Sequence, residues 1–356
     1  MARRRTFLGG LLATGLGPAF SWAKVGNPRF LSAAKTPQGA YVLCGLDSSG
    51  QITFKLPLPA RGHAAAAHPS QAKAVAFARR PGRFALVLNC ATGEEIAALQ
   101  APTGRHFYGH GTYSADGSVL FTTENDYETA RGLVGVWDVT RTPRRIAEFL
   151  SGGVGPHDIK MLPDGHTLVV ANGGIETHPD TGRVKLNIPT MQSNLTYLSL
   201  DGDVLEQVEL DAGHQRNSIR HLAVSQDGTV AFAMQWQGGA APDRPLLGTH
   251  RRSDGSLTLV PKASVQALNG YIGSVAISEE GSRIAITSPR RGVAQLFDQV
   301  QLTSELEIPD VCGISAVDGG FFVTSGNGIC RSPQDKVVRH PLAWDNHLVP
   351  VGNAGA

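Results

Sequence analysis

Four histidines occur at the same relative place in four repeated segments of the chain. His63 and His157 lie seven residues before a turn, whereas His110 and His221 lie six residues before one. Neutral imidazole is a ligand for zinc, copper, iron and nickel. If the four segments surround a common channel, these histidines predict a site for a transition metal such as iron or copper.

The one-residue offset between the two pairs of histidines leaves a second interpretation open. Successive side chains of a regular β-strand point to opposite faces, so the two pairs would point in opposite directions. Each histidine could then hold neighbouring segments together through hydrogen bonds, without any metal. The sequence does not decide between ligand binding and this structural role.

Three arginines, Arg61, Arg105 and Arg220, stand close to these histidines in the sequence. A planar guanidinium pairs well with carboxylates and phosphates, so the same place could bind an anionic ligand. The alternative is a set of salt bridges between repeats, to acids such as Glu124 or Asp158. Both roles are compatible with the sequence.

Two polar insertions, over residues 124–132 and 172–187, interrupt the third and fourth repeats. Long polar loops on a rigid scaffold commonly carry binding residues. We expect the second insertion to be an ordered loop over the channel mouth. Together the two insertions add the candidate ligand-binding residues Glu124, Asn172, His178 and Arg183.

The elements that must position these residues are short β-strands. Runs rich in β-branched residues, such as 119–122, 168–170 and 230–233, are separated by turn residues. We find no sustained helical periodicity after the first residues, and the chain contains 42 glycines and 21 prolines, as turn-dense β folds require. The sequence therefore predicts an all-β protein.

A longer repeat lies over the strands, in which one strand enters a tight turn at Asp116, Asp164, Asp227 or Glu280. These turn acids lie 48, 63 and 53 residues apart, a spacing typical of four-stranded propeller blades with loop insertions. A fainter copy begins at Arg61, and further units cover residues 28–60 and 312–343. We predict one seven-bladed β-propeller domain over residues 24–356, whose first and last units share strands to close the ring.

Residues 1–23 have the layout of a twin-arginine signal peptide. Arg3, Arg4 and Arg5 precede a mildly apolar, glycine-rich stretch that ends at Ser21-Trp22-Ala23, a small-residue cleavage site. We expect export in folded form to the periplasm and cleavage near Ala23. No stable membrane insertion is expected afterwards, because a spanning helix needs roughly 17 or more apolar residues.

Composition excludes several classes of function. The net charge of +2 comes partly from the leader's arginines, so the surface of the mature protein is near neutral. Nucleic acid is therefore excluded as a partner, because it binds to strongly basic surfaces. Cys44, Cys90, Cys312 and Cys330 form no metal-binding motif. Cys312 and Cys330 could bridge neighbouring strands or be buried as small hydrophobic residues. The commonest hydrolase, nucleotide-binding and zinc-protease motifs do not occur.

Several segments resemble a family of bacterial twin-arginine-exported propellers known as domain of unknown function 1513. The resemblance covers roughly residues 60–290 and is carried by Arg61-Gly-His63, Arg105-His-Phe-Tyr-Gly-His110-Gly, Thr123 to Thr129, Gly155-Pro-His157, Val170 to Pro179, Ser218 to Leu222 and Thr287-Ser-Pro289. The family's activity is not established. Its members accompany imelysin-like, iron-regulated proteins, which implies a part in periplasmic iron or other metal acquisition.

Three functions follow from these observations. We favour a non-enzymatic periplasmic binding protein, an accessory of metal acquisition that binds a ligand or a partner protein of an uptake system at the channel mouth. The alternative is a metal-dependent propeller enzyme of the oxidoreductase or lactonase type, with His110, His157 and His221 as ligands or bases. A third candidate is a structural module that binds another protein without a channel ligand.

Overall fold

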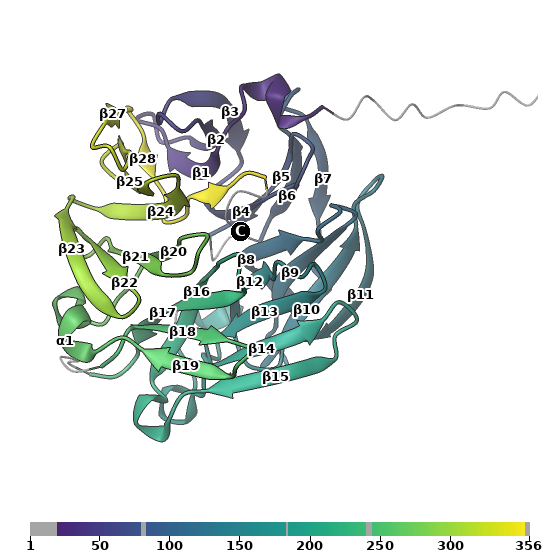
Figure 1. Ribbon diagram of the computed structural model, residues 1–356. Coiled ribbons are helices and arrows are strands. Elements are labelled where there is room, and N and C mark those ends of the chain that lie inside the picture. Colours follow the sequence, from purple (N-terminus) through teal and green to yellow (C-terminus); the bar gives the residue numbers. More distant parts are fainter. Residues whose placement is uncertain (1–19, 80–82, 183, 240–243, 353–356) are drawn as a thin grey trace, which may run out of the picture.

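The computed structural model describes residues 20–79, 83–182, 184–239 and 244–352, and these residues form a ring of seven antiparallel sheets (Figure 1). The predicted seven-bladed β-propeller is thereby confirmed. In six blades the first strand in the sequence lies nearest the central axis and the fourth lies at the rim. We number the blades from 1 to 7 in chain order.

The C-terminal strands of the chain complete blade 1. The strand bounds of blade 1 are β1 (Phe30–Lys35), β2 (Tyr41–Leu46), β3 (Ile52–Leu58), β28 (Ala343–Trp344) and β29 (Val349–Pro350). Strand β1 pairs with β2 on one side and with both β28 and β29 on the other. The ends of the chain therefore share a sheet, which closes the ring as predicted.

The other six blades have four strands each. Blade 2 contains β4 (Gly62–Ala67), β5 (Lys73–Ala78), β6 (Ala85–Asn89) and β7 (Glu95–Leu99). Blade 3 contains β8 (Arg105–Tyr113), β9 (Val119–Asp126), β10 (Arg131–Asp138) and β11 (Arg144–Leu150). Blade 4 contains β12 (Pro156–Met161), β13 (Thr167–Asn172), β14 (Asn194–Ser199) and β15 (Val204–Glu209). Blade 5 contains β16 (Asn217–Val224), β17 (Thr229–Trp236), β18 (Leu247–Arg251) and β19 (Ser256–Leu259). Blade 6 contains β20 (Ser274–Ile277), β21 (Arg283–Ser288), β22 (Val293–Asp298) and β23 (Gln301–Glu307). Blade 7 contains β24 (Val311–Val317), β25 (Gly320–Ser325), β26 (Ile329–Arg331) and β27 (Val337–Arg339).

Helices are few and short in the described residues. They are the α-helix α1 (Lys262–Val265) and the 3-10 helices η1 (Trp22–Val25), η2 (Pro179–Thr181), η3 (Ile188–Thr190), η4 (Ala212–His214) and η5 (Gln266–Leu268). None of the helices in this part of the chain has the length and apolar character needed to cross a membrane.

The Asp-Gly turns end the inner strands in the way that the sequence predicts. In blade 3 the Ser114 hydroxyl donates to Asp116 Oδ1 (2.6 Å) and accepts from the amide of Val119 (2.9 Å). Gly117 takes a positive φ of 76°, which glycine adopts without a steric penalty. Local turn chemistry therefore sets where each inner strand ends.

The hydrophobic core lies between neighbouring blades. Leu195 and Tyr197 of blade 4, for example, pack with Leu222 and Phe232 of blade 5 in one buried cluster. Because each blade buries its apolar faces only against its neighbours, the complete ring is needed to cover the core. The rigid ring in turn holds the inner strands at fixed positions around the axis.

The two predicted insertions differ from each other in the structure. The expectation of a loop over 124–132 is wrong, because β9 and β10 continue their pairing to Asp126 and Arg131 and leave only a short turn. Residues 173–182 and 184–187 do form an ordered loop. The Asn187 side chain holds it together by accepting from the Glu176 amide (2.8 Å) and donating to the Gly174 carbonyl (2.9 Å).

Most of the predicted leader, residues 1–19, lies outside the described residues. Phe20 to Val25 belong to the folded part, where Trp22 is only 7% exposed and donates its indole N–H to the His68 carbonyl (2.9 Å). The four cysteines named above are all buried with free thiols. The interpretation of Cys312 and Cys330 as buried small hydrophobic residues is the one that the structure supports.

Candidate metal centre

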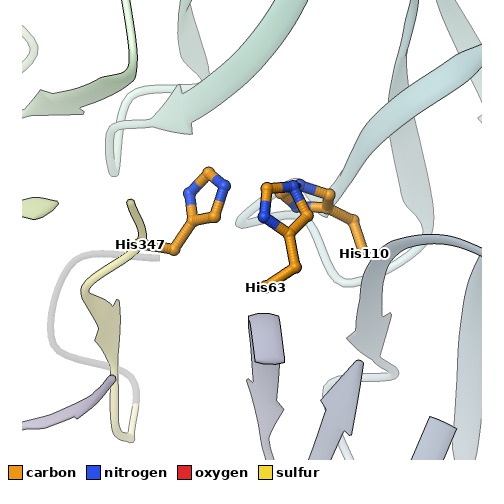
Figure 2. Close-up of side chains that lie close together, drawn as sticks. All are labelled: His63, His110 and His347. Atoms are coloured by element: carbon orange, nitrogen blue, oxygen red, sulfur yellow. The ribbon is translucent and has the colours of Figure 1, made fainter. Parts of the chain in front are cut away.

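Five histidine side chains meet on the axis of the propeller. His63, His110, His157 and His221 lie on the inner strands β4, β8, β12 and β16, and His347 lies between β28 and β29. Figure 2 shows the rings of His63, His110 and His347 close together, although they come from three different segments. We call these five residues the histidine cluster.

The rings of the histidine cluster are close enough for several of them to bind one ion. The Nε2 atoms of His63 and His110 are 3.2 Å apart, and the ring centroid of His347 lies 4.5 Å from that of His63. On the other side of the cluster the rings of His157 and His221 are 4.8 Å apart. Two sets of three can each bring their ring nitrogens within 4.8 Å of one another: His63, His110 and His347, and His110, His157 and His221.

Backbone irregularities explain why the one-residue offset does not separate the rings. The pairing of each inner strand with its neighbour shifts register next to its histidine: between Gly62 and Ala65, Phe107 and Gly111, Pro156 and Asp158, and Ile219 and His221. A β-bulge interrupts the alternation of side chains and changes the direction in which a side chain points. All four inner-strand histidines can therefore face the axis.

His347 is the ligand candidate that the sequence analysis missed. It belongs to no repeat and lies in the connection of residues 345–348 between the two closing strands. Its carbonyl accepts from the Ser32 hydroxyl of β1 (3.0 Å), which fixes it to the first strand of the ring. The sequence does contain a signal for it, since His347 lies two residues before a strand that completes a blade, much as His63 and His157 lie at the second residue of theirs.

Asp158 orients one histidine of the cluster. The His110 Nδ1–H donates to Asp158 Oδ1 (3.1 Å), while the amides of Ile159 (2.9 Å) and Leu222 (3.0 Å) donate to the same carboxylate. The Lys160 ammonium lies 3.5 Å from it. Because this contact occupies Nδ1, the Nε2 of His110 is the nitrogen that can bind a metal.

Several ring nitrogens of the cluster have no protein partner. Among the described residues, no hydrogen-bond partner lies near the buried atoms His63 Nδ1, His221 Nδ1 and His347 Nε2. His157 Nδ1 donates to the Arg220 carbonyl (2.9 Å), so its Nε2 is the unprotonated nitrogen. Buried polar atoms in folded proteins are nearly always paired, and unpaired ones call for an explanation such as a bound ion.

The environment keeps four histidines of the cluster in the neutral form that binds metals. Burial, followed by the neighbouring positive groups, lowers the pKa of His63, His157 and His347 well below the ordinary value of 6.5. The pKa of His221 falls to about 3, again mainly because of burial. Burial by itself would raise the pKa of Asp158, but Lys160 and His110 outweigh it and hold that pKa well below its usual range.

Of the three predicted arginines, only Arg220 lies beside the cluster, where burial and then its charge help to lower the pKa of His157 and His221. Arg61 pairs with Asp345 (2.6 Å), as does Arg79 (2.8 Å), and this holds the C-terminal connection two residues before His347. Arg105 pairs with Glu148 inside blade 3. Arg220 is adjacent to His221 on β16 and supplies the carbonyl that His157 contacts.

The other candidate ligand-binding residues also have contacts within their own blade or loop. Glu124 is fully buried and pairs with Arg145 (2.7 Å) in blade 3. Asn172 donates to the Ser151 carbonyl (2.8 Å) in the interior of blade 4. His178 caps η2 and packs its ring against that of Tyr127 (5.0 Å). Arg183 lies outside the described residues.

A chamber of about 310 Å³ extends from the cluster along the axis of the ring. At one end it reaches His110, His221, His347 and Asp158, and at the other it reaches the turns that end the inner strands. All seven blades contribute to its wall. A ligand bound at the cluster could therefore extend into this chamber.

Comparison with known proteins identifies the family. A family model described as "Protein of unknown function (DUF1513)" matches residues 56–351. None of the curated proteins matches this chain. A chain of Kuenenia stuttgartiensis hydrazine synthase is similar in structure, with a TM-score of 0.60 and 14% identity, over 93% of this chain and 99% of that one.

A second similar structure is the β-propeller domain of Myceliophteria thermophila Cps50 (Swd1), with a TM-score of 0.59 and 11% identity. The match covers 92% of this chain and 94% of that one. At such low identities, both likenesses support the propeller fold and nothing more specific. Because the family model spans most of the sequence, however, this chain belongs to the DUF1513 family.

Proposed function

We propose that this protein binds a transition-metal ion at the histidine cluster and works in the periplasm as an accessory of iron or other metal acquisition. The observation that carries the proposal is the convergence of five imidazoles, of which four are buried and that of His157 is half-buried; three of the five have a nitrogen without a partner among the described residues. Neutral imidazoles that all face one point suit a cation far better than they suit one another.

The donor set favours a first-row transition metal. It consists of imidazole nitrogens with one carboxylate behind them, whereas magnesium and calcium require mostly oxygen ligands. Two imidazole nitrogens bound to the same ion at about 2.0–2.1 Å lie roughly 3.0–3.4 Å apart. The 3.2 Å between the Nε2 atoms of His63 and His110 falls in this range.

A metal-dependent enzyme is the second candidate. It is favoured by the chamber that meets the cluster, since a metal there could hold a substrate as well as its protein ligands. Against it stands the scarcity of acid and base groups, because Asp158 and Lys160 are the only charged side chains, histidines aside, among the described residues that line the chamber. We therefore favour binding over turnover.

The test is the metal content of the protein isolated from the periplasm without a histidine tag. Mass spectrometry before and after incubation with iron(II), copper(II), zinc or nickel should find about one ion per chain. His110→Ala and His347→Ala should each lose it, because either change removes a ligand. His166→Ala is the matched control, since His166 is exposed on the turn between β12 and β13.

Folding of the variants is checked by circular dichroism, so that lost metal is not confused with a lost fold. Wild-type protein that binds none of the four ions contradicts the proposal and leaves the histidines as contacts between blades. Export is tested separately by replacing Arg3, Arg4 and Arg5 with lysine. That variant should stay in the cytoplasm, and unchanged periplasmic yield would contradict the proposed export route.

A further inference from the structure

We infer that the chamber beside the histidine cluster binds a small monocarboxylate, whose carboxylate coordinates the metal and pairs with Lys160. This inference rests on the metal site proposed above and names the ligand class of that site. No covalent bond forms or breaks, because the carboxylate occupies a coordination position reversibly. The argument depends on the shape, the opening and the charge of the chamber.

The size and wall of the chamber suit a small ligand with a short apolar part. Its volume of about 310 Å³ lies near the lower limit of small-molecule sites. The four consecutive alanines of β4 (residues 64–67), together with Val275 and Ile314, provide apolar surface. A short alkyl chain could lie against this surface while its carboxylate reaches the cluster.

The chamber is accessible from the side of the inner-strand turns. The turn residues Ala115 and Gln226 line it and are exposed to solvent. Lys160 and Met161 line it and are half-buried. At the other end, where the inner strands begin, Asp345 pairs with Arg61 and Arg79 and so ties the C-terminal connection of blade 1 to the neighbouring blade 2. We therefore expect the ligand to enter past the turns.

Charge balance makes the ligand an anion. An imidazole that binds a metal brings no negative charge, so a divalent ion held by these rings would keep its full charge inside the protein. Asp158 contributes one negative charge and Lys160 one positive charge to the chamber. A buried net positive charge is costly unless it is compensated, and a carboxylate on the metal would compensate part of it. Lys160 then provides a second attractive contact.

The experiment uses cobalt(II) as the metal, because its visible absorption responds to changes in its ligands. Full-length mature protein is loaded with cobalt(II) and titrated with acetate, butyrate and azide. Acetate and butyrate should change the absorption and saturate. Lys160→Met should weaken carboxylate affinity about tenfold, which corresponds to about 1.4 kcal/mol. Cobalt stoichiometry should stay the same.

Two further variants locate the bound carboxylate. Ala316→Trp fills the chamber from the wall and should abolish butyrate binding more completely than acetate binding. Lys336→Met, which removes an exposed lysine between β26 and β27, is the control and should change nothing. Cobalt binding by each variant is measured first, so that the metal site and the chamber are tested separately.

Four outcomes would overturn the inference. If cobalt binds but its absorption does not respond to carboxylates, the chamber is not a carboxylate site, although the metal site stands. A response to azide alone refutes the carboxylate class. Carboxylate binding that is unaffected by both Lys160→Met and Ala316→Trp places the anion elsewhere. If the protein binds neither cobalt nor any other ion, both the metal site and carboxylate binding in the chamber are refuted.

A second inference concerns the leader and comes from an independent observation. We infer that processing cuts between Ala19 and Phe20, not after Ala23. The Phe20 carbonyl accepts from the Ala72 amide (2.6 Å), and Ser21 forms a β-bridge with Gln71. Trp22 is buried in the same hydrophobic cluster as residues of blades 1 and 2. A cut after Ala23 would remove these contacts.

The turn on which this segment lies departs from the other repeats. Pro69-Ser70-Gln71 stands where blades 3, 4, 5 and 7 have Asp-Gly, and the packed segment supplies contacts to this turn. Gly17 and Ala19 provide the small residues that signal peptidases require three positions and one position before a cut. The chain therefore offers a cleavage site that keeps Trp22.

N-terminal sequencing of the periplasmic protein tests this inference. We expect Phe20 as the first residue, and Ala19→Leu should block processing whereas Ala23→Leu should not. A mature protein that begins at Lys24 would overturn it without affecting the proposed export. A chain found only in the cytoplasm with its leader attached would instead contradict both the export and the processing.

Discussion

The Asp158 carboxylate links His110 of blade 3 to the backbone of blade 5 through the Leu222 amide. A carboxylate behind a metal-binding histidine fixes the ring and its tautomer, and loss of such a partner typically weakens metal affinity 10–100-fold. Asp158→Asn should therefore lower metal affinity by about one to two orders of magnitude. Competition with a chelating indicator measures this.

The control for this prediction is Asp164→Asn, which changes an acid in the turn that follows β12 and should leave affinity unchanged. Equal affinities of wild type and Asp158→Asn would show that the carboxylate does not support the site. The amide can retain hydrogen bonds from the backbone, so a loss of affinity would report on the charge and on His110.

The low pKa of His221 predicts how the metal-free protein responds to acid. The pKa is about 3 in the folded state and about 6.5 when unfolded, so between these values the unfolded chain binds more protons. The contribution of His221 to the free energy of unfolding is therefore fully present above pH 6.5 and is lost as the pH falls from 6.5 towards 3. In this range the free energy of unfolding falls by about 1.4 kcal/mol for each pH unit of acidification, for one such group.

Urea unfolding of the metal-free protein between pH 7.5 and pH 5 measures this slope. His221→Gln should be less sensitive to pH than wild type, since one buried imidazole no longer needs to stay neutral. His166→Gln alters an exposed histidine and should keep the wild-type slope. A slope that His221→Gln does not reduce would mean that this imidazole is not held neutral by burial.

At the level of elements, the bulged starts of the inner strands decide how the histidines are directed. Gly109 lies in the irregular part of β8, directly before His110, with a φ of 102°. A Cβ atom there would come within 2.8 Å of His63 Cδ2. Only glycine fits both the backbone conformation and the close approach of the ring.

Gly109→Ala should therefore weaken metal binding by displacing His63, and should destabilise the fold by about 1–3 kcal/mol. Metal titration and urea unfolding measure the two effects. Gly213→Ala in η4 is the control, because its Cβ would meet nothing within 4 Å. If both variants behave like wild type, Gly109 does not position the ring.

At the level of the whole molecule, the metal site and the ring closure use the same segment. His347 lies between β28 and β29, the strands that join the C-terminal end of the chain to β1. A metal bound to His347 and to the inner strands should therefore stabilise the closure. Ligand at 100 times its Kd adds about 2.7 kcal/mol, or roughly 100-fold protection against opening.

Amide hydrogen exchange measures the protection strand by strand. Metal should slow exchange in β1 and β29 of the wild type, and His347→Ala should abolish most of this effect. Strand β22, in the middle of blade 6, serves as the internal reference. Equal protection in the variant and the wild type would show that the metal does not couple the two ends of the chain.

Much of the fold could be predicted from the sequence because its determinants are local. Strand alternation, Asp-Gly turns and the spacing of the turn acids repeat along the chain, and a repeat that cannot bury its faces alone must stack into a ring. The same repeats placed His63, His110, His157 and His221 at equivalent positions. These features depend on residues a few positions apart.

The tertiary structure alone decided how the site is assembled. Register shifts turned the offset histidines towards one point, and a glycine such as Gly109 can be assigned to such a shift only once the backbone is known. Ring closure brought His347 to residues more than 280 positions earlier, and folding paired Arg105 with Glu148 and Glu124 with Arg145 inside blade 3. Contacts between distant segments depend on the packing of the whole ring, which local periodicity does not encode.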